Sequence, residues 1–68
     1  MKSTPFLTAL RLAGERDLTL ARPCLELEVS ISELETLLNR GNIKALETCA
    51  AWIGIPLGTF ITTLYPID

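Results

Sequence analysis

Residues Val29 to Leu57 carry the start and stop signals of two consecutive helices, and they constrain the fold more than any other segment. Ser30 and Glu33 have the spacing of a capping box, in which each side chain bonds the other residue's backbone N–H. The pattern therefore predicts a helix from about residue 31 to residue 40, with a start defined to within about two residues.

Turn residues bound the second helix of this segment. Gly41 can adopt the left-handed conformation that closes the preceding helix, and Asn42 can cap the next one. That helix is predicted from about residue 43 to 53, because one face carries Leu46, Cys49, Ala50 and Ile53. Gly54 ends it, and Pro56 permits a final short helix with Leu57, Phe60, Ile61 and Leu64 on its apolar face.

Another helix is predicted at the start of the chain. The run Ser3-Thr4-Pro5 supplies a hydroxyl cap and a proline for the first helical position. The helix should reach about Ala13, with Arg16 as its outer limit and Gly14 as its expected stop.

The segment from Cys24 to Ile31 carries two conflicting signals. Its apolar residues alternate strictly with polar ones, and a period of two is typical of a half-buried strand. Pro23 and the capping box instead favour a short helix followed by a turn. The sequence thus predicts an all-α bundle of about five short helices with a helix-turn-helix, and an α+β domain if residues 24–31 form a strand.

Size and composition predict a single domain spanning residues 1–68. With 49% apolar residues, so short a chain should expose an apolar patch, so we expect a homodimer or a protein partner. No apolar run approaches the roughly 20 residues of a membrane span, and no secretory signal is recognisable, so we expect a cytoplasmic protein without membrane contact.

The residues that usually carry chemistry are scarce. Cys24 and Cys49 are isolated and there is no histidine, so we expect no metal, no cofactor and reduced, buried thiols. Paired acids such as Glu33 and Glu35 are two positions apart on a helix and do not face each other. We therefore expect neither enzymatic activity nor a small-molecule substrate.

Together these signals resemble the Cro/C1-type helix-turn-helix family of phage and bacterial regulators. The resemblance covers roughly residues 6 to 61 and is carried by Leu18-Thr19, Val29-Ser30, Asn39-Arg40-Gly41-Asn42 and Ile53-Gly54-Ile55-Pro56-Leu57. It implies a bundle in which the third helix enters the major groove of DNA. It also implies the function of a small repressor-like regulator from a phage or mobile element, binding operator DNA as a dimer.

The resemblance also implies which side chains contact DNA. On the helix-turn-helix they are Thr19, Ser30, Ser32, Glu33 and Thr36. Just after its second helix they are Asn39, Arg40, Asn42 and Lys44. Helix capping and ordinary solvated polarity are the alternative roles for these residues. The aromatic residues Trp52, Phe60 and Tyr65 are expected either at the edge of the core or in a dimer interface.

Several residues depart from the family's pattern. Pro23 falls inside the second helix, where proline costs about 3 kcal/mol unless it opens the helix. Glu28 occupies the turn position that is often glycine, and Leu20 replaces a polar residue that typically contacts DNA.

Charge opposes DNA binding. The net charge is −2, and residues 15–35 contain six acids and two bases. Phosphate neutralisation supplies most non-specific DNA affinity, which a reading helix carrying Glu33 and Glu35 would oppose. The alternative function is a protein-interaction module of the same fold, an antiactivator or antirepressor, whose acidic helices bind a basic protein partner or mimic the charge of DNA.

Overall fold

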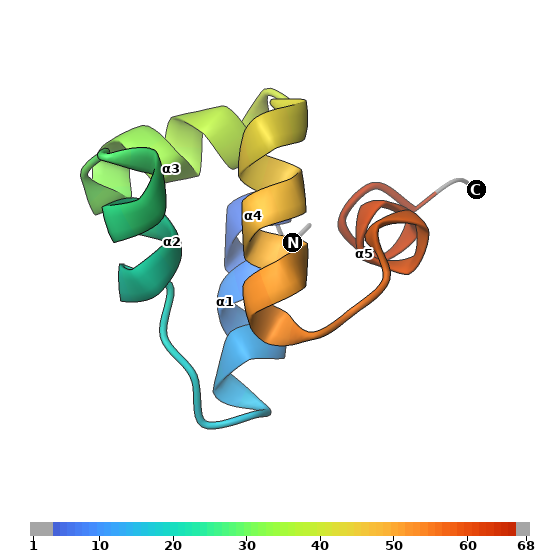
Figure 1. Ribbon diagram of the computed structural model, residues 1–68. Coiled ribbons are helices and arrows are strands. Elements are labelled where there is room, and N and C mark those ends of the chain that lie inside the picture. Colours follow the sequence, from blue (N-terminus) through green and yellow to red (C-terminus); the bar gives the residue numbers. More distant parts are fainter. Residues whose placement is uncertain (1–3, 67–68) are drawn as a thin grey trace.

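The computed structural model describes residues 4–66, and within them the chain forms five helices and no strand (Figure 1). The helices are α1 (Pro5–Gly14), α2 (Ala21–Leu27), α3 (Ile31–Asn39), α4 (Ile43–Ile53) and α5 (Leu57–Leu64). The predicted all-α bundle is confirmed, and the α+β alternative is wrong.

Local capping overrides the alternating pattern of residues 24–31. Glu28 takes the left-handed conformation (φ 57°) that closes α2, and the Val29 N–H donates to the carbonyl oxygen of Cys24 at 3.0 Å. The Ser30 hydroxyl then accepts from the Glu33 N–H at 3.1 Å, while the Glu33 carboxylate accepts from the Ser30 N–H at 2.8 Å. The capping box is therefore present as predicted, and it starts α3 at Ile31.

Pro23 is accommodated because it is the third residue of α2. In the first turn of a helix the backbone N–H has no intrahelical acceptor, so a proline there removes no hydrogen bond. The first bond of α2 runs from the Cys24 N–H to the carbonyl oxygen of Leu20 at 3.3 Å. Leu20 itself is 1% exposed, so the residue that departs from the polar pattern of the family belongs to the core.

The end of α1 differs from the prediction. Gly14 is the last residue of α1 but does not adopt a left-handed conformation, which Asp17 provides instead with φ 57°. The Leu18 N–H donates back to the carbonyl oxygen of Ala13 at 2.8 Å, which closes a Schellman motif around Asp17. The stops after α3 and α4 lie where predicted, at Gly41 (φ 77°) and Gly54 (φ 86°).

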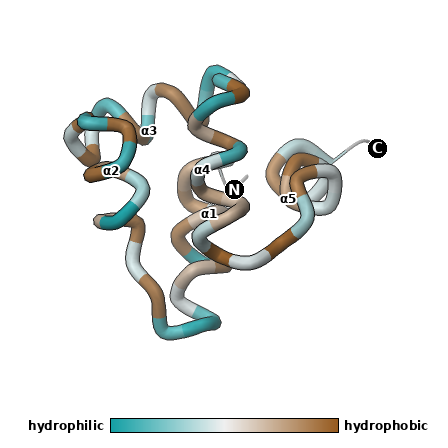
Figure 2. Tube along the Cα trace, viewed as in Figure 1, coloured by the Kyte–Doolittle hydropathy of each residue, from teal (hydrophilic) through white to brown (hydrophobic). Residues whose placement is uncertain are grey.

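The core surrounds α4, which contacts each of the other four helices. The fully buried side chains of the core include Leu20, Leu34, Leu38, Leu46, Cys49 and Phe60. The turns after α1 and α3 are hydrophilic, whereas α5 carries apolar residues toward α4 (Figure 2). Among the described helices, none is long and apolar enough by itself to cross a bilayer, and α4 and α5 reach that length only as a pair bent by 110°.

Candidate binding surface of the helix-turn-helix

The helix that a helix-turn-helix would present to DNA has one buried and one exposed face. Leu34 and Leu38 on α3 are fully buried against the core, and Leu37 is partly buried. The exposed side chains of α3 are Ile31, Ser32, Glu33, Glu35, Thr36 and Asn39. This face therefore contains an exposed isoleucine and two acids, and it contains no base.

Three of the side chains predicted to contact DNA on or beside α3 form local hydrogen bonds. Ser30 and Glu33 bond each other's backbone in the capping box, and hydrogen bonding with Ser30, chiefly from its backbone N–H, lowers the pKa of the Glu33 carboxyl group. The Thr36 hydroxyl donates to the carbonyl oxygen of Ser32 at 3.2 Å. Ser32, the fourth predicted contact in this part of the chain, has an exposed side chain that forms no such bond among residues 4–66.

The two asparagines predicted to bind phosphate also cap helices. The Asn42 side-chain oxygen accepts from the Ala45 N–H at 3.0 Å, so it caps α4 as the sequence predicts. The Asn39 side-chain oxygen accepts from the Phe6 N–H at 3.0 Å, and it thereby joins the end of α3 to the start of α1. The sequence gives no signal for the bond between Asn39 and Phe6, because these residues are 33 positions apart.

Thr19 is held in place by two hydrogen bonds. Its carbonyl oxygen accepts from the indole Nε1 of Trp52 at 2.8 Å, and its hydroxyl accepts from the Ala21 N–H at 3.4 Å. The hydrogen bond from the Ala21 N–H is long, and the N-cap residue of α2, Leu20, forms no side-chain capping bond. Thr19 therefore has a structural role at the start of α2, and its contact with DNA stays a prediction.

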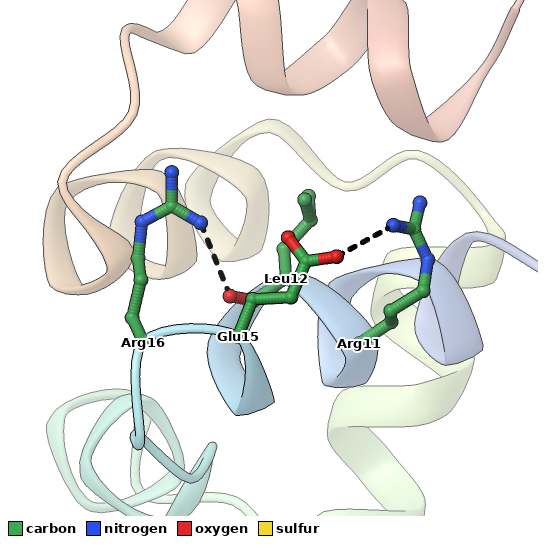
Figure 3. A network of polar contacts seen from close by, with 4 residues as sticks. All are labelled: Arg11, Leu12, Glu15 and Arg16. Carbon is green, nitrogen blue, oxygen red and sulfur yellow. Dashed lines mark hydrogen bonds and ion pairs between the residues drawn. The ribbon is translucent and has the colours of Figure 1, made fainter.

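Most of the arginines are engaged near their own helices. Figure 3 shows Arg11 paired with Glu15 at 3.0 Å and the Arg16 guanidinium donating to the Leu12 carbonyl oxygen at 3.2 Å. Arg22 lies 4.0 Å from the carboxylate of Glu26. Within residues 4–66, the bases that form no ion pair and no hydrogen bond through the side chain are Arg40 and Lys44, both exposed around the turn between α3 and α4.

The three aromatic residues expected at a core edge or dimer interface occupy different environments. Phe60 is 0% exposed, so its side chain belongs to the monomer core and is not available to a second subunit. Tyr65 is partly buried, and its hydroxyl donates to the carbonyl oxygen of Leu38. Trp52 is 37% exposed, and its indole bonds the loop between α1 and α2.

An open apolar groove lies beside the start of both helices of the helix-turn-helix. Its volume is about 590 Å³, and its lining residues are Leu10, Thr19, Leu20, Ala21, Cys24, Leu25, Val29 and Ile31. Three of them remain substantially exposed, with Leu10 at 37%, Leu25 at 73% and Ile31 at 49%. Sequence reasoning missed this groove, although the exposed apolar patch that it predicted is found here.

Both thiols are free and in their neutral form. Burial, and to a lesser degree the neighbouring Cys24, raises the pKa of the Cys49 thiol to about 12, and burial also raises the pKa of Cys24. Across residues 4–66, acids and thiols do not gather in a group that could hold a metal ion.

Comparison with other proteins adds no relative. No protein-family model, curated protein or solved structure matches this chain.

Proposed function

We propose that this chain is a regulator of helix-turn-helix architecture whose α2–α3 surface binds a protein partner. The observation that carries the proposal is the chemistry of that surface, on which the exposed apolar residues Leu25 and Ile31 line one groove and the Glu35 carboxylate lies one turn from Ile31. A surface of this kind suits an apolar partner with basic edges.

Burial of the apolar residues favours a protein over DNA. Covering a large apolar side chain contributes about 1.5–3 kcal/mol when the contact is also apolar. DNA offers mainly charged phosphate and polar base edges to a helix in the major groove, so Leu25 and Ile31 would gain little there.

Charge supports the same choice. A protein that neutralises several phosphates depends on lysine and arginine at the contact surface. On α3 the exposed charged residues are Glu33 and Glu35, and the nearest base without an ion pair is Arg40 at the C-terminal end of the helix. These carboxylates would repel DNA and attract a basic protein surface.

The proposal is tested by comparing two kinds of binding. We expect no retention of random duplex DNA even at about 50 mM salt, where phosphate contacts are strongest. We also expect immobilised wild-type protein to capture a partner from cells that carry the gene, and Glu35→Lys to lose it. Glu47→Lys, an exposed reversal on α4, is the matched control and should keep the partner. DNA binding that weakens about a hundredfold or more between 50 and 200 mM salt would overturn the proposal.

A second function, operator binding by a homodimer, is favoured by one observation. Arg40 and Lys44 are exposed on either side of the α3–α4 turn, where the resembled family grips the phosphate backbone. If this function is the right one, Arg40→Ala and Lys44→Ala should each weaken binding to all sequences and reduce the salt slope by about 1. The same substitutions should not affect binding of a protein at Leu25 and Ile31.

A further inference from the structure

We propose that the groove between α1, α2 and the start of α3 binds an amphipathic helix of the partner, with lysine or arginine beside its apolar stripe. This inference rests on the proposed function and specifies the chemistry of the partner.

The lining of the groove suits apolar side chains from a helix. Leu20, Cys24 and Val29 form buried or partly buried parts of the lining, and the exposed Leu10, Leu25 and Ile31 extend it outward. The side-chain hydroxyl of the lining belongs to Thr19, and it already accepts a hydrogen bond from the Ala21 N–H. A small polar ligand would therefore find few polar groups to orient it, whereas apolar residues at positions i, i+3 or i+4, and i+7 of a helix can fill such a groove.

A carboxylate next to the groove defines the charge of its occupant. Glu35 lies one turn after Ile31 on α3, so the two side chains are neighbours, whereas Glu26 lines a second pocket with Asn42 and Lys44. The guanidinium of Arg22 is 4.0 Å from Glu26 and offsets part of its charge, but Glu35 has no ion-pair partner among residues 4–66. A basic segment beside the apolar stripe would complement Glu35.

The charge of this surface argues against a second copy of this chain in the groove. A two-fold pairing of identical surfaces would place both copies of Glu35 in one interface, and neither the groove lining nor the exposed face of α3 offers a base to pair with them. Like charges at an interface disfavour association, so a basic partner fits this groove better than the chain itself.

A natural reporter is hydrogen-bonded to the wall of the groove. Trp52 is the only tryptophan of the chain, and its indole bonds the carbonyl oxygen of Thr19, which lines the groove. Filling the groove changes the surroundings of Thr19 and of this bond. Emission from Trp52 should therefore respond to an occupant that itself contains no tryptophan.

The test uses a tryptophan-free peptide of about 18 residues made of leucine and lysine at helical spacing, which gives about five turns with one apolar face. Its affinity is measured by anisotropy of an attached fluorophore at about 150 mM salt, so that weak surface charge effects are screened. The unlabelled peptide is titrated while Trp52 emission is recorded. We expect saturable binding with a change in emission. A peptide with glutamate in place of lysine, and one with the same leucines and lysines in alternation, should bind at least about tenfold more weakly.

Variants locate the contact. Leu25→Ser and Ile31→Ser alter exposed side chains and should leave the fold intact, while each weakens peptide binding about tenfold. Ile43→Ser is the matched control, because Ile43 is 58% exposed but does not line the groove. Glu35→Lys should weaken binding severalfold, whereas Glu47→Lys should leave it unchanged.

The outcomes separate the groove from the proposed function. If Glu35→Lys abolishes peptide binding but Leu25→Ser and Ile31→Ser do not change it, the proposal that the peptide binds in the groove is wrong. The proposed function, binding of a protein at the acidic surface, is then still supported. Failure of the wild-type protein to bind the leucine–lysine peptide would also contradict the proposal for the groove. If the protein in addition binds duplex DNA in a salt-sensitive way, the proposed protein-binding function is wrong as well.

Discussion

The indole Nε1 of Trp52 donates a hydrogen bond of 2.8 Å to the carbonyl oxygen of Thr19, 33 residues earlier in the chain. The bond joins the third turn of α4 to the loop that leads into α2. Because Thr19 lines the apolar groove, this single contact helps to fix the position of one groove wall.

Removing this donor should destabilise the protein modestly. In Trp52→Phe the ring is smaller and the N–H is lost, so the free energy of unfolding should fall by about 1 kcal/mol, the usual net value of one hydrogen bond. Urea unfolding followed by far-UV circular dichroism measures the change. Equal stability of the two proteins would mean that water replaces the indole at Thr19 without cost.

Replacing Glu28, whose backbone is in the left-handed conformation, by glycine should stabilise the folded protein. Glu28 has φ 57°, a conformation that costs a residue with a Cβ atom about 1 kcal/mol or more relative to glycine. Glu28→Gly should therefore raise the free energy of unfolding by about 1 kcal/mol. Glu26→Gly, inside α2, should lower it by up to about 1 kcal/mol, because glycine weakens a helix interior. A lower stability for Glu28→Gly would contradict the strain argument.

The side chain of Asn39 should contribute to the stability of the folded protein whether or not it contacts a ligand. Asn39→Ala removes the acceptor of the Phe6 N–H and should cost about 1 kcal/mol, as the loss of a helix cap does. Asn39→Asp keeps an acceptor, and its negative charge is favoured by the dipole of α1 but opposed by that of α3, whose last residue it is, so its stability should stay close to wild type. Thermal unfolding of the two variants decides this, and equal losses would exclude the capping role.

Stability should decline at alkaline pH because of Cys49. Below pH 9.0, the ordinary pKa of a thiol, Cys49 is neutral in both states. As the pH rises from there toward its folded pKa of about 12, the unfolded chain loses the thiol proton while the folded chain retains it. The free energy of unfolding should then fall by about 1.4 kcal/mol per pH unit through this one group.

Cys49→Ala should remove that part of the decline. The measurement is urea unfolding at about pH 8 and again near pH 10.5, which brackets the start of thiol ionisation in the unfolded chain. Cys24→Ala is the control, since Cys24 is less buried and its removal should flatten the decline less. An equal slope in wild type and Cys49→Ala would show that other groups cause the alkaline loss.

Sequence reasoning predicted the elements whose signals are local. The caps at Ser30 and Asn42 and the left-handed glycines at Gly41 and Gly54 lie within a few residues of the helix ends that they define. Over residues 24–31 the sequence supports both a strand and a helix, because the period of two and the capping box are both local signals.

The candidate site could be predicted only in part. Exposed acids and an apolar patch follow from composition, but the groove exists because α1, α2 and the start of α3 come together in space. The capping role of Asn39 likewise depends on the distant start of α1. No pattern along the chain encodes such juxtapositions.

The hydroxyl of Tyr65 completes the end of α3 by donating to the carbonyl oxygen of Leu38, 27 positions earlier. While the chain is being synthesised, the helix-turn-helix therefore emerges from the ribosome long before the residue that secures it. A nascent chain that ends before Phe60 lacks the core residues of α5, and any chain that has not reached Tyr65 leaves this carbonyl without the hydroxyl that bonds it. A chain that terminates prematurely within α5 should consequently fail to fold stably and be degraded by proteases, so it should not act as a shortened regulator.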